Sequence, residues 1–183
     1  MTSPALAAAL LASVLGTATV PPAPDFRAHD LDGHDVVLAR ELESHKAVVI
    51  VFLSTVCPYA NYFAEHLRKL SDAYEAKGVA FIGINSNESE TAQETAELRR
   101  QWGYRFPVVM DGGARIADLL GARRTPEAFL MDTSGRVRYH GWVKSKLGST
   151  DLEDALGALL AGRRVRRPRT AAYGCSIDRP KAE

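Results

Sequence analysis

The sequence predicts an α/β domain in which helices flank a central mixed sheet and a β-hairpin comes first. Three observations lead to this fold class. Residues Ala47–Leu53 are seven consecutive apolar residues rich in β-branched side chains, which is typical of a strand covered on both faces. Strand-like and helix-like segments alternate after it, as in layered α/β domains. Before it, Asp32-Gly33 lies between two strand-like stretches and predicts a hairpin turn.

The first predicted elements are the hairpin, a short helix and the buried strand. Residues Asp25 to Leu38 form the hairpin, with Asp32-Gly33 at its turn. Residues Ala39 to His45 are expected to form a short helix or turn. The apolar run Ala47–Leu53 then follows as the central strand.

A long helix is predicted to begin at Pro58, because the first turn of a helix does not need the backbone N–H that proline lacks. Apolar residues then recur at steps of three or four and form one stripe, made of Tyr59, Phe63, Leu67, Leu70 and Tyr74. The pair Lys77-Gly78 ends this helix. Residues Val79 to Ile84 predict a second buried strand.

The remaining elements complete the order hairpin, βαβα, ββα, so the sheet is expected to contain parallel and antiparallel strands. We expect a helix over Thr91 to Trp102, a strand over Pro107 to Met110, a helical turn or two over Ala114 to Leu120, two strands over Glu127 to Met131 and Val137 to His140, and a final helix over Asp151 to Leu160. The last two strands are joined by Asp132-Thr133-Ser134-Gly135, which has the composition of a hairpin loop.

The length of 183 residues suits one domain with one core, which we predict over residues 21–162. The formal net charge is +1, so no overall field attracts nucleic acid. Residues 163–183 form a basic tail that carries Cys175. Its arginines are interpreted as a solvated tail rather than a binding patch.

The N-terminal residues 1–20 are predicted to be a signal peptide or a disordered leader. Residues Ala5 to Leu15 are almost entirely apolar and are followed by the small residues Gly16, Thr17 and Ala18, as in a signal peptide. The segment is shorter than the roughly 20 residues of a membrane span, so no stable membrane insertion is expected. We therefore expect export, to the periplasm or outside the cell. No Lys or Arg precedes the segment, however, and without a signal the chain would be cytoplasmic.

The two cysteines, Cys57 and Cys175, are too few for a disulfide scaffold and fit no structural zinc pattern. They could form one disulfide, two free thiols or a redox pair. The five histidines lie apart in sequence, and no two form a helical ligand pair. The sequence therefore supports no metal site, and we expect no cofactor.

Cys57 is the main candidate for chemistry because it lies between a buried strand and the helix predicted to begin at Pro58. Unpaired backbone N–H groups and the helix dipole at that place favour a thiolate. The alternative is a small buried hydrophobic residue, as many free cysteines are.

Four segments of the chain, taken in order, carry a resemblance to a known family: Ala23-Pro24-Asp25-Phe26, the strand leading to Cys57-Pro58, Thr125-Pro126, and Asp132-Thr133-Ser134-Gly135-Arg136-Val137. From Pro24 to Gly162 the chain resembles a thioredoxin-like redoxin, of the group that contains the alkyl hydroperoxide reductase/thiol-specific antioxidant proteins and the bacterial periplasmic thiol oxidoreductases. The resemblance implies a three-layer thioredoxin-like fold, with Thr125-Pro126 as the family's cis-proline. Pro58, Thr125 and Pro126 would then shape the site. The terminal Gly174-Cys175-Ser176-Ile177 is similar to the cysteine tail of some redoxins with a single site cysteine.

The sequence departs from both well-known branches of this group. Thioredoxins carry two site cysteines separated by two residues, but here Ala60 holds the second place and Val56 replaces the usual tryptophan. Peroxiredoxins carry Pro-x-x-x-Thr/Ser-x-x-Cys, and here Ser54 fits the hydroxyl position while Ile50 stands in place of the proline.

Three functions therefore stay open, with the first preferred. As an antioxidant peroxidase, the Cys57 thiolate would attack a peroxide and become a sulfenic acid. Ser54 would orient the thiolate or peroxide, Arg124 would stabilise the thiolate, and Cys175 would resolve the sulfenic acid as a disulfide that an external thiol reduces. As a thiol–disulfide exchange protein, Cys57 would instead attack a disulfide of a protein substrate. In the third alternative the fold is a non-catalytic accessory module.

Overall fold

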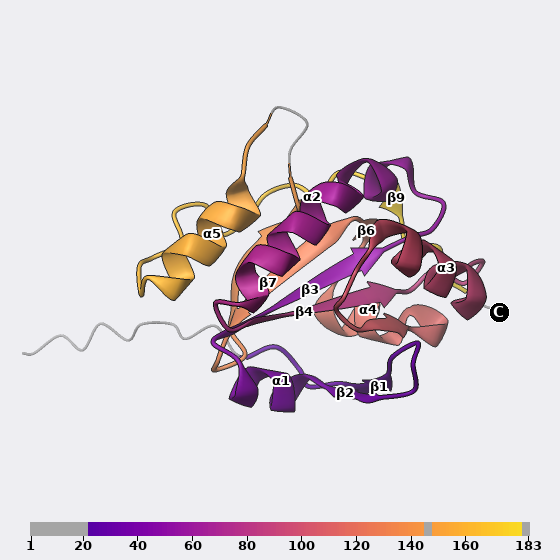
Figure 1. Ribbon diagram of the computed structural model, residues 1–183, viewed down its shortest axis with the longest axis horizontal. Coiled ribbons are helices and arrows are strands. Elements are labelled where there is room, and N and C mark those ends of the chain that lie inside the picture. Colours follow the sequence, from indigo (N-terminus) through magenta and orange to yellow (C-terminus); the bar gives the residue numbers. More distant parts are fainter. Residues whose placement is uncertain (1–21, 145–147, 181–183) are drawn as a thin grey trace, which may run out of the picture.

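The computed structural model describes residues 22–144 and 148–180, which form three layers with one sheet in the middle (Figure 1). The predicted leader, residues 1–20, lies outside the described residues. Within the described ranges, no helix has both the length and the apolar character needed to cross a membrane.

The central sheet has five strands in the order β5-β4-β3-β7-β8. Strand β3 (Ala47–Leu53) runs parallel to β4 (Val79–Asn85), which runs parallel to β5 (Val108–Met110). Strand β7 (Glu127–Asp132) is antiparallel to β3 and to β8 (Val137–Gly141). The predicted thioredoxin-like fold with a mixed central sheet is confirmed.

The apolar run of β3 supplies both cores because successive side chains of a strand point to opposite faces. All seven residues of β3 are buried. Val49, Val51 and Leu53 belong to the core on one face, and Val48, Ile50 and Phe52 belong to the core on the other. A continuous apolar run is what a strand with two covered faces requires.

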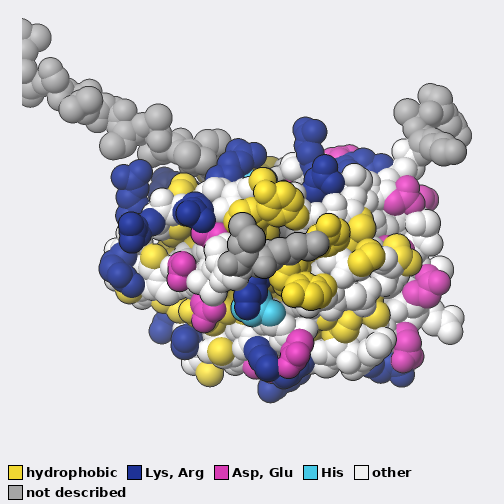
Figure 2. Space-filling view, turned by 90° about the horizontal axis from the view of Figure 1, so that it is seen from above, with side chains coloured by type: hydrophobic (Ala, Val, Ile, Leu, Met, Phe, Trp, Pro, Cys, Tyr) yellow, Lys and Arg dark blue, Asp and Glu magenta, His cyan; other side chains and the backbone are white. Residues whose placement is uncertain are grey.

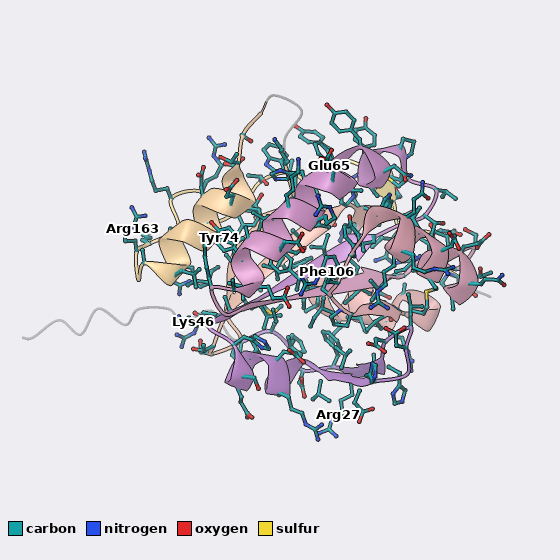
Figure 3. All side chains as sticks on the ribbon, viewed as in Figure 1. Arg27, Lys46, Glu65, Tyr74, Phe106 and Arg163 are labelled. Atoms are coloured by element: carbon teal, nitrogen blue, oxygen red, sulfur yellow. The ribbon has the colours of Figure 1, made fainter. Side chains whose placement is uncertain are left out.

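The first face is covered by α2 (Pro58–Glu75) and α5 (Asp151–Leu160), with α3 (Ala92–Trp102) in contact with α2 (Figure 1). The predicted apolar stripe of α2 is buried at Phe63, Leu67, Leu70 and Tyr74. In Figure 3, Tyr74 and Phe106 lie between this helical layer and the sheet, whereas Arg27 and Arg163 lie at the periphery.

The second face is covered by a hairpin and two short helices. Strands β1 (Arg27–His29) and β2 (Asp35–Val37) form the predicted hairpin as a separate two-stranded sheet. Helix α1 (Leu38–Ser44) follows it. Further along the chain, the 3-10 turn Gly112–Ala114 leads into α4 (Arg115–Leu120), which packs on the same core through Ile116 and Ala117.

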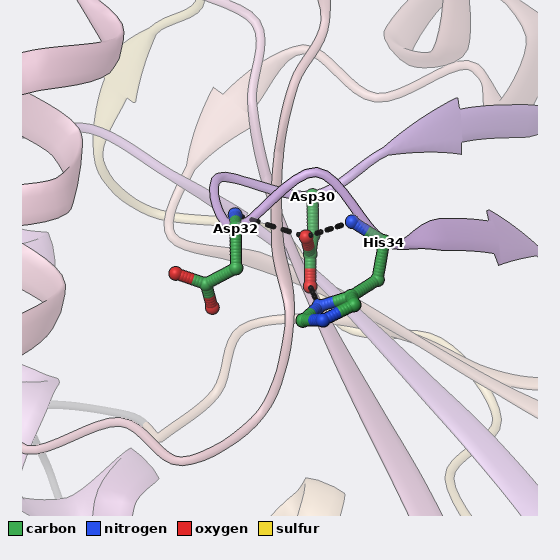
Figure 4. Close-up of side chains that lie close together, drawn as sticks. All are labelled: Asp30, Asp32 and His34. Atoms are coloured by element: carbon green, nitrogen blue, oxygen red, sulfur yellow. Dashed lines mark hydrogen bonds and ion pairs between the residues drawn. The ribbon is translucent and has the colours of Figure 1, made fainter.

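The hairpin loop gathers Asp30, Asp32 and His34, whose ligand-type atoms lie within 4.8 Å of one another (Figure 4). One Asp30 oxygen accepts hydrogen bonds from the backbone N–H groups of Asp32 and His34, at 2.9 and 2.8 Å. The other lies 3.3 Å from the His34 ring. These bonds account for the cluster as the framework of a tight turn.

The C-terminal tail differs from the expected solvated segment, because it packs along the domain. Val165 and Ile177 are buried in the two cores. Strand β9 (Cys175–Ser176) pairs antiparallel with β6 (Arg124–Thr125), the short strand before Pro126. The arginine-rich composition did not predict these contacts, because each consists of a single apolar residue or of one backbone pairing.

Candidate active site

Cys57 lies where β3 gives way to α2, as the sequence predicts. It is the N-cap residue of α2, with extended backbone angles, and Pro58 occupies the first turn. Its side chain has no exposed surface. The buried strand and the proline therefore fix the thiol at a helix N-terminus inside the protein.

The predicted cis-proline faces this thiol. The peptide bond between Thr125 and Pro126 is cis. The carbonyl oxygen of Thr125 accepts a hydrogen bond from the Cys57 thiol at 2.9 Å. Two segments separated by 68 residues in sequence thus meet at one sulfur atom.

The tail brings the second cysteine to the same place. In the β6–β9 pairing, Cys175 is the partner of Thr125. The thiol of Cys175 forms a hydrogen bond with the Cys57 sulfur, and both cysteines are free thiols. Cys175 is half-buried, so the tail forms an outer wall over Cys57.

The surroundings of Cys57 favour its thiolate. Burial raises the pKa of a thiol, because a low-dielectric environment penalises the charged form. Hydrogen bonds from the Cys175 thiol, from the backbone N–H groups of Ala60 and Cys175, and from the Thr125 hydroxyl outweigh this effect, and the pKa of Cys57 falls below its ordinary value. Within the described residues the buried Thr125 hydroxyl has no hydrogen-bond partner, so it is available to donate to a thiolate on Cys57.

The pKa of Cys175 shifts in the opposite direction. Its hydrogen bond to Cys57, its partial burial and the nearby negative charge of Cys57 raise its pKa to about 11, while the Arg124 guanidinium acts in the lowering direction. The two thiols behave as one coupled pair. When the pair loses one proton, the charge resides on Cys57 and the remaining proton stays on Cys175.

Ser54 contacts the backbone of Cys57. Its hydroxyl oxygen accepts a hydrogen bond from the Cys57 backbone N–H at 3.2 Å, and its O–H donates to Glu90 at 2.5 Å. A hydroxyl has one proton to donate. That proton is committed to Glu90, so this geometry offers no Ser54 donor for the thiolate or a peroxide.

Glu90 was not anticipated from the sequence, although it is buried and holds the loop before Cys57. Its carboxylate accepts hydrogen bonds from the Ser54 hydroxyl, from the Thr55 backbone N–H at 2.5 Å and from the Asn85 side chain at 2.8 Å. In the sequence, Glu90 is one of two glutamates in a polar loop. The only distinguishing signal is its position just before the N-cap Thr91 of α3.

Arg124, expected beside the Cys57 thiolate, points instead to the tail. Its guanidinium donates to the carbonyl oxygen of Gly174 at 3.0 Å. The backbone N–H groups of Arg123 and Arg124 both donate to Glu127 at 2.8 Å, and Glu127 also pairs with His140. Glu127 and His140 therefore support the segment that presents Thr125.

The exposed surface around α2 contains apolar side chains. Val56 and Tyr62, on either side of the start of α2, are 73% and 72% exposed. Figure 2, which views the molecule from the side of α2, shows hydrophobic side chains gathered on this face. On the tail, the exposed Tyr173 stacks on Trp142, with ring centroids 5.1 Å apart.

Comparisons with known proteins find a matching family model and a curated relative. The family model described as AhpC/TSA family matches residues 21–140, which include Cys57 and Pro126 but not Cys175. A curated relative from Halalkalibacterium halodurans, named thiol-disulfide oxidoreductase ResA, is 35% identical over 114 residues, which are 62% of this chain and 62% of the relative. The match thus spans less than two thirds of that relative's length.

Two crystal structures share the fold closely. A hypothetical protein from Sinorhizobium meliloti is 30% identical with a TM-score of 0.82, and the match covers 88% of this chain and 94% of the other. A conserved protein from Geobacillus kaustophilus is also 30% identical, with a TM-score of 0.81 and coverages of 88% and 92%.

Proposed function

The chain belongs to the AhpC/TSA family, and from this premise we propose that it is a thiol–disulfide oxidoreductase that uses Cys57 and Cys175 as its redox pair. The substrate class is a disulfide, in a protein or a small molecule, and an external thiol reduces the enzyme after each turnover. The single observation that carries the proposal is the placement of two free thiols side by side: Cys175 pairs with Thr125, whose carbonyl oxygen accepts the hydrogen bond from the Cys57 thiol.

In the first step, the Cys57 thiolate attacks one sulfur of the substrate disulfide. A bond forms between that sulfur and Cys57 Sγ, the substrate S–S bond breaks, and the other substrate sulfur leaves as a thiolate. The thiolate is the nucleophile in such exchange, so the lowered pKa of Cys57 increases the reactive fraction at neutral pH.

In the second step, Cys175 attacks Cys57 Sγ in the mixed disulfide. The largest cause of the raised pKa of Cys175 is its hydrogen bond to Cys57, followed by its burial and then by the charge of Cys57. The hydrogen bond to the Cys57 thiolate and its charge disappear once Cys57 is in a mixed disulfide, while the favourable effect of Arg124 stays. Cys175 therefore ionises more easily at the stage where it is needed. The second substrate thiolate leaves, and the pair ends as a Cys57–Cys175 disulfide.

The observations support disulfide exchange better than the peroxide reduction preferred from the sequence. The O–H of Ser54 is bonded to Glu90, and Arg124 is bonded to the Gly174 carbonyl, so neither assembles a peroxide site around Cys57 as expected. Cys175 supplies a second thiol, which thioredoxins carry at the position that Ala60 occupies here. The name of the curated relative points in the same direction.

The proposal is tested by giving the reduced protein one equivalent of oxidised glutathione or of hydrogen peroxide and following the loss of free thiol. We expect the disulfide to react faster and to yield an intramolecular Cys57–Cys175 disulfide with release of two glutathione molecules. Non-reducing peptide mapping identifies the product.

Two variants serve as matched controls. The Cys175→Ala protein should stop at a mixed disulfide between Cys57 and glutathione, and the Cys57→Ala protein should not react at a comparable rate. Faster reaction with peroxide than with the disulfide, together with a sulfenic acid on Cys57, would establish the peroxidase instead.

We also propose export, on the sequence of residues 5–18 alone. Expression in the native host should yield a mature chain that begins between about Thr17 and Pro24, the region of small residues and prolines after the apolar segment. Intact-mass analysis of cell fractions identifies the residue at which the mature chain begins. A full-length chain in the cytoplasmic fraction would rule the proposal out.

A further inference from the structure

A groove of about 770 Å³ lies between the N-terminal hairpin and α4, on the face of the sheet away from α2 (Figure 1). Just after β1, Asp30 and Val109 form an isolated bridge to β5, and the N–H of Leu31 donates to the Val108 carbonyl at 2.9 Å. Strand β1 itself pairs with β2 in a separate sheet, so the hairpin leaves the central sheet and the groove opens between them. Its volume lies within the range of about 300–1,000 Å³ that is usual for small-molecule sites.

The groove has an apolar floor. Phe26, Val37 and Ile116 line it and are buried. Met110 and Leu119 continue the apolar lining toward solvent, and Leu119 is 42% exposed. Covering such exposed apolar surface with an apolar ligand removes it from water and is favourable. The floor therefore suits the apolar part of a ligand.

Three arginines from three different elements lie at the rim of this floor. They are Arg27 of β1, Arg40 of α1 and Arg115 of α4, and all three are exposed. Within the residues that the structure describes, none of their guanidinium groups forms an ion pair or a hydrogen bond. A guanidinium group binds the paired oxygens of a carboxylate or phosphate through two parallel N–H groups. The rim is therefore suited to an anion.

The two carboxylates that also line the groove already have partners. Asp111 is buried and accepts hydrogen bonds from the Ser86 hydroxyl at 2.7 Å and from the backbone N–H groups of Ile116 and Ala117 in α4. The carboxylate of Asp35 lies 3.0 Å from the ring of His29. Neither carboxylate neutralises a groove arginine, so the three guanidinium groups are available to an external anion.

We propose that this groove binds an amphipathic anion, whose carboxylate or phosphate headgroup contacts Arg27, Arg40 and Arg115 while its aliphatic or aromatic body lies on the apolar floor. The floor alone would favour a neutral hydrocarbon, and the arginines alone would favour an inorganic anion. Their combination in one groove selects a ligand that has both parts. The groove shares no lining residue with the surroundings of Cys57 and Cys175 described above, so this inference goes beyond the proposed redox function and does not rest on it.

The proposal is tested by titrating the full-length reduced protein with decanoate and with decyl phosphate, below the concentrations at which they form micelles. Isothermal titration calorimetry should show saturable binding of at least one of the two at a single site, and the tighter probe identifies the headgroup. Butanoate keeps a carboxylate with a short body, and decan-1-ol keeps the body without the charge. Both should bind at least about tenfold more weakly, because each lacks one of the two contacts. Equal affinity for either control, or saturable binding of neither probe, would overturn the proposal.

A double variant tests the arginines. Arg27→Gln together with Arg115→Gln removes one charge from each side of the groove and should weaken binding of the tighter probe by about fivefold or more. Added salt should weaken binding to the wild type, because exposed charges are screened. The matched control is Arg163→Gln, since Arg163 is also exposed and lies on the other side of the molecule from Arg27 (Figure 3). It should bind like the wild type. Equal affinities of the double variant and the wild type would overturn the proposal.

A separate variant tests the floor. Leu119→Asn removes exposed apolar surface and leaves every charge in place. It should weaken binding of the same probe and leave its salt dependence unchanged. Thermal unfolding should show that all these variants unfold like the wild type, since the four substituted residues are exposed. Unchanged affinity of the Leu119→Asn protein would count against an apolar contact in the groove.

Amide chemical shifts locate the bound probe. Those of Ala28, Met110 and Leu119 should change on binding, because these residues line the groove. A probe that instead shifts the amides of Val56 and Tyr62 would assign the binding to the exposed apolar surface near the start of α2, and it would overturn the groove. None of these readouts requires thiol chemistry. The groove can therefore be confirmed while the proposed redox function fails, and the reverse can also occur.

Discussion

The reactivity of Cys57 depends on a small set of hydrogen-bond donors around a buried sulfur. Burial alone would favour the neutral thiol, and the donors from Cys175, Ala60 and Thr125 reverse that preference. The same interaction holds the proton of Cys175. Cys57 is thus the sulfur that ionises first, and Cys175 keeps its proton.

Replacing Cys175 with alanine should raise the pKa of Cys57. The variant loses the thiol donor, which contributes the largest lowering effect, while the burial that opposes ionisation remains. Ultraviolet thiolate absorbance against pH, in the wild type and the Cys175→Ala protein, measures the change. An unchanged or lower pKa of Cys57 in the variant would show that the backbone donors and the helix N-terminus suffice.

The Glu90→Gln substitution should lower the free energy of unfolding by about 1–3 kcal/mol, because a buried donor loses its acceptor when an amide nitrogen replaces a carboxylate oxygen. The affected donors are the Ser54 hydroxyl and the Thr55 backbone N–H. Urea denaturation measures the loss. Glu88→Gln is the control, since Glu88 lies two residues away with an exposed side chain. Equal unfolding midpoints of the two variants would refute a structural role for Glu90.

At the residue scale, local signals predicted some of the site and missed the rest. The place of Cys57 at a helix start follows from the apolar strand and Pro58, which are adjacent in sequence. The contacts of Glu90 and Arg124 depend on segments 35 and 50 residues away. No spacing within the chain indicates such contacts.

At the scale of elements, the sheet was predictable because its strands carry strong local patterns. The unbroken apolar run of β3 is buried on both faces, and the stripe of α2 packs on one of them. Strands β6 and β9 have two residues each and no such pattern. Their pairing depends on the cis-proline segment and on the approach of Gly174, which only the folded chain brings together.

The β6 segment depends on Glu127, and this dependence should appear in the pH profile of stability. Burial raises the pKa of Glu127, but the hydrogen bonds with His140 and with the backbone N–H groups of Arg123 and Arg124 outweigh it and lower the pKa below 4.5. A carboxyl with a lower pKa in the folded state stabilises the fold above the unfolded pKa. This contribution is lost as the pH falls from about 4.5 through the folded pKa.

The Glu127→Gln protein should therefore be less stable than the wild type at neutral pH, and the difference should shrink below about pH 4.5. Urea unfolding midpoints at a series of pH values provide the measurement. Glu43→Gln, on an exposed position of α1, is the control and should follow the wild type. A difference that is constant with pH would mean that the charge of Glu127 has no part in the stability.

At the scale of the whole molecule, the tail contacts β8, β6, the loop at Asn87 and α4, which are far apart in the sequence. The backbone N–H of His140 in β8 donates to Pro168, and Thr170 donates back to His140. Cys175 then pairs with β6, Asp178 contacts the loop at Asn87, and the Arg179 side chain donates to Asp118 of α4 at 2.9 Å. Most of these contacts are single hydrogen bonds near the surface, in contrast to strand β3, whose seven residues are all buried.

This contrast predicts a hierarchy of opening. Regions held by few buried apolar contacts open with less free energy than the core, so the tail should undock while the sheet stays intact. In native-state hydrogen exchange of the reduced protein, the amides of Thr170, Ile177 and Asp178 should exchange faster than those of β3, with little dependence on low urea concentrations. Oxidation to the Cys57–Cys175 disulfide should slow the three tail amides and leave β3 unchanged, because the bond closes the route by which the tail leaves. Equal protection of tail and β3 in the reduced protein would mean that the tail opens only by global unfolding, and a substrate segment could not then reach Cys57 in the folded state.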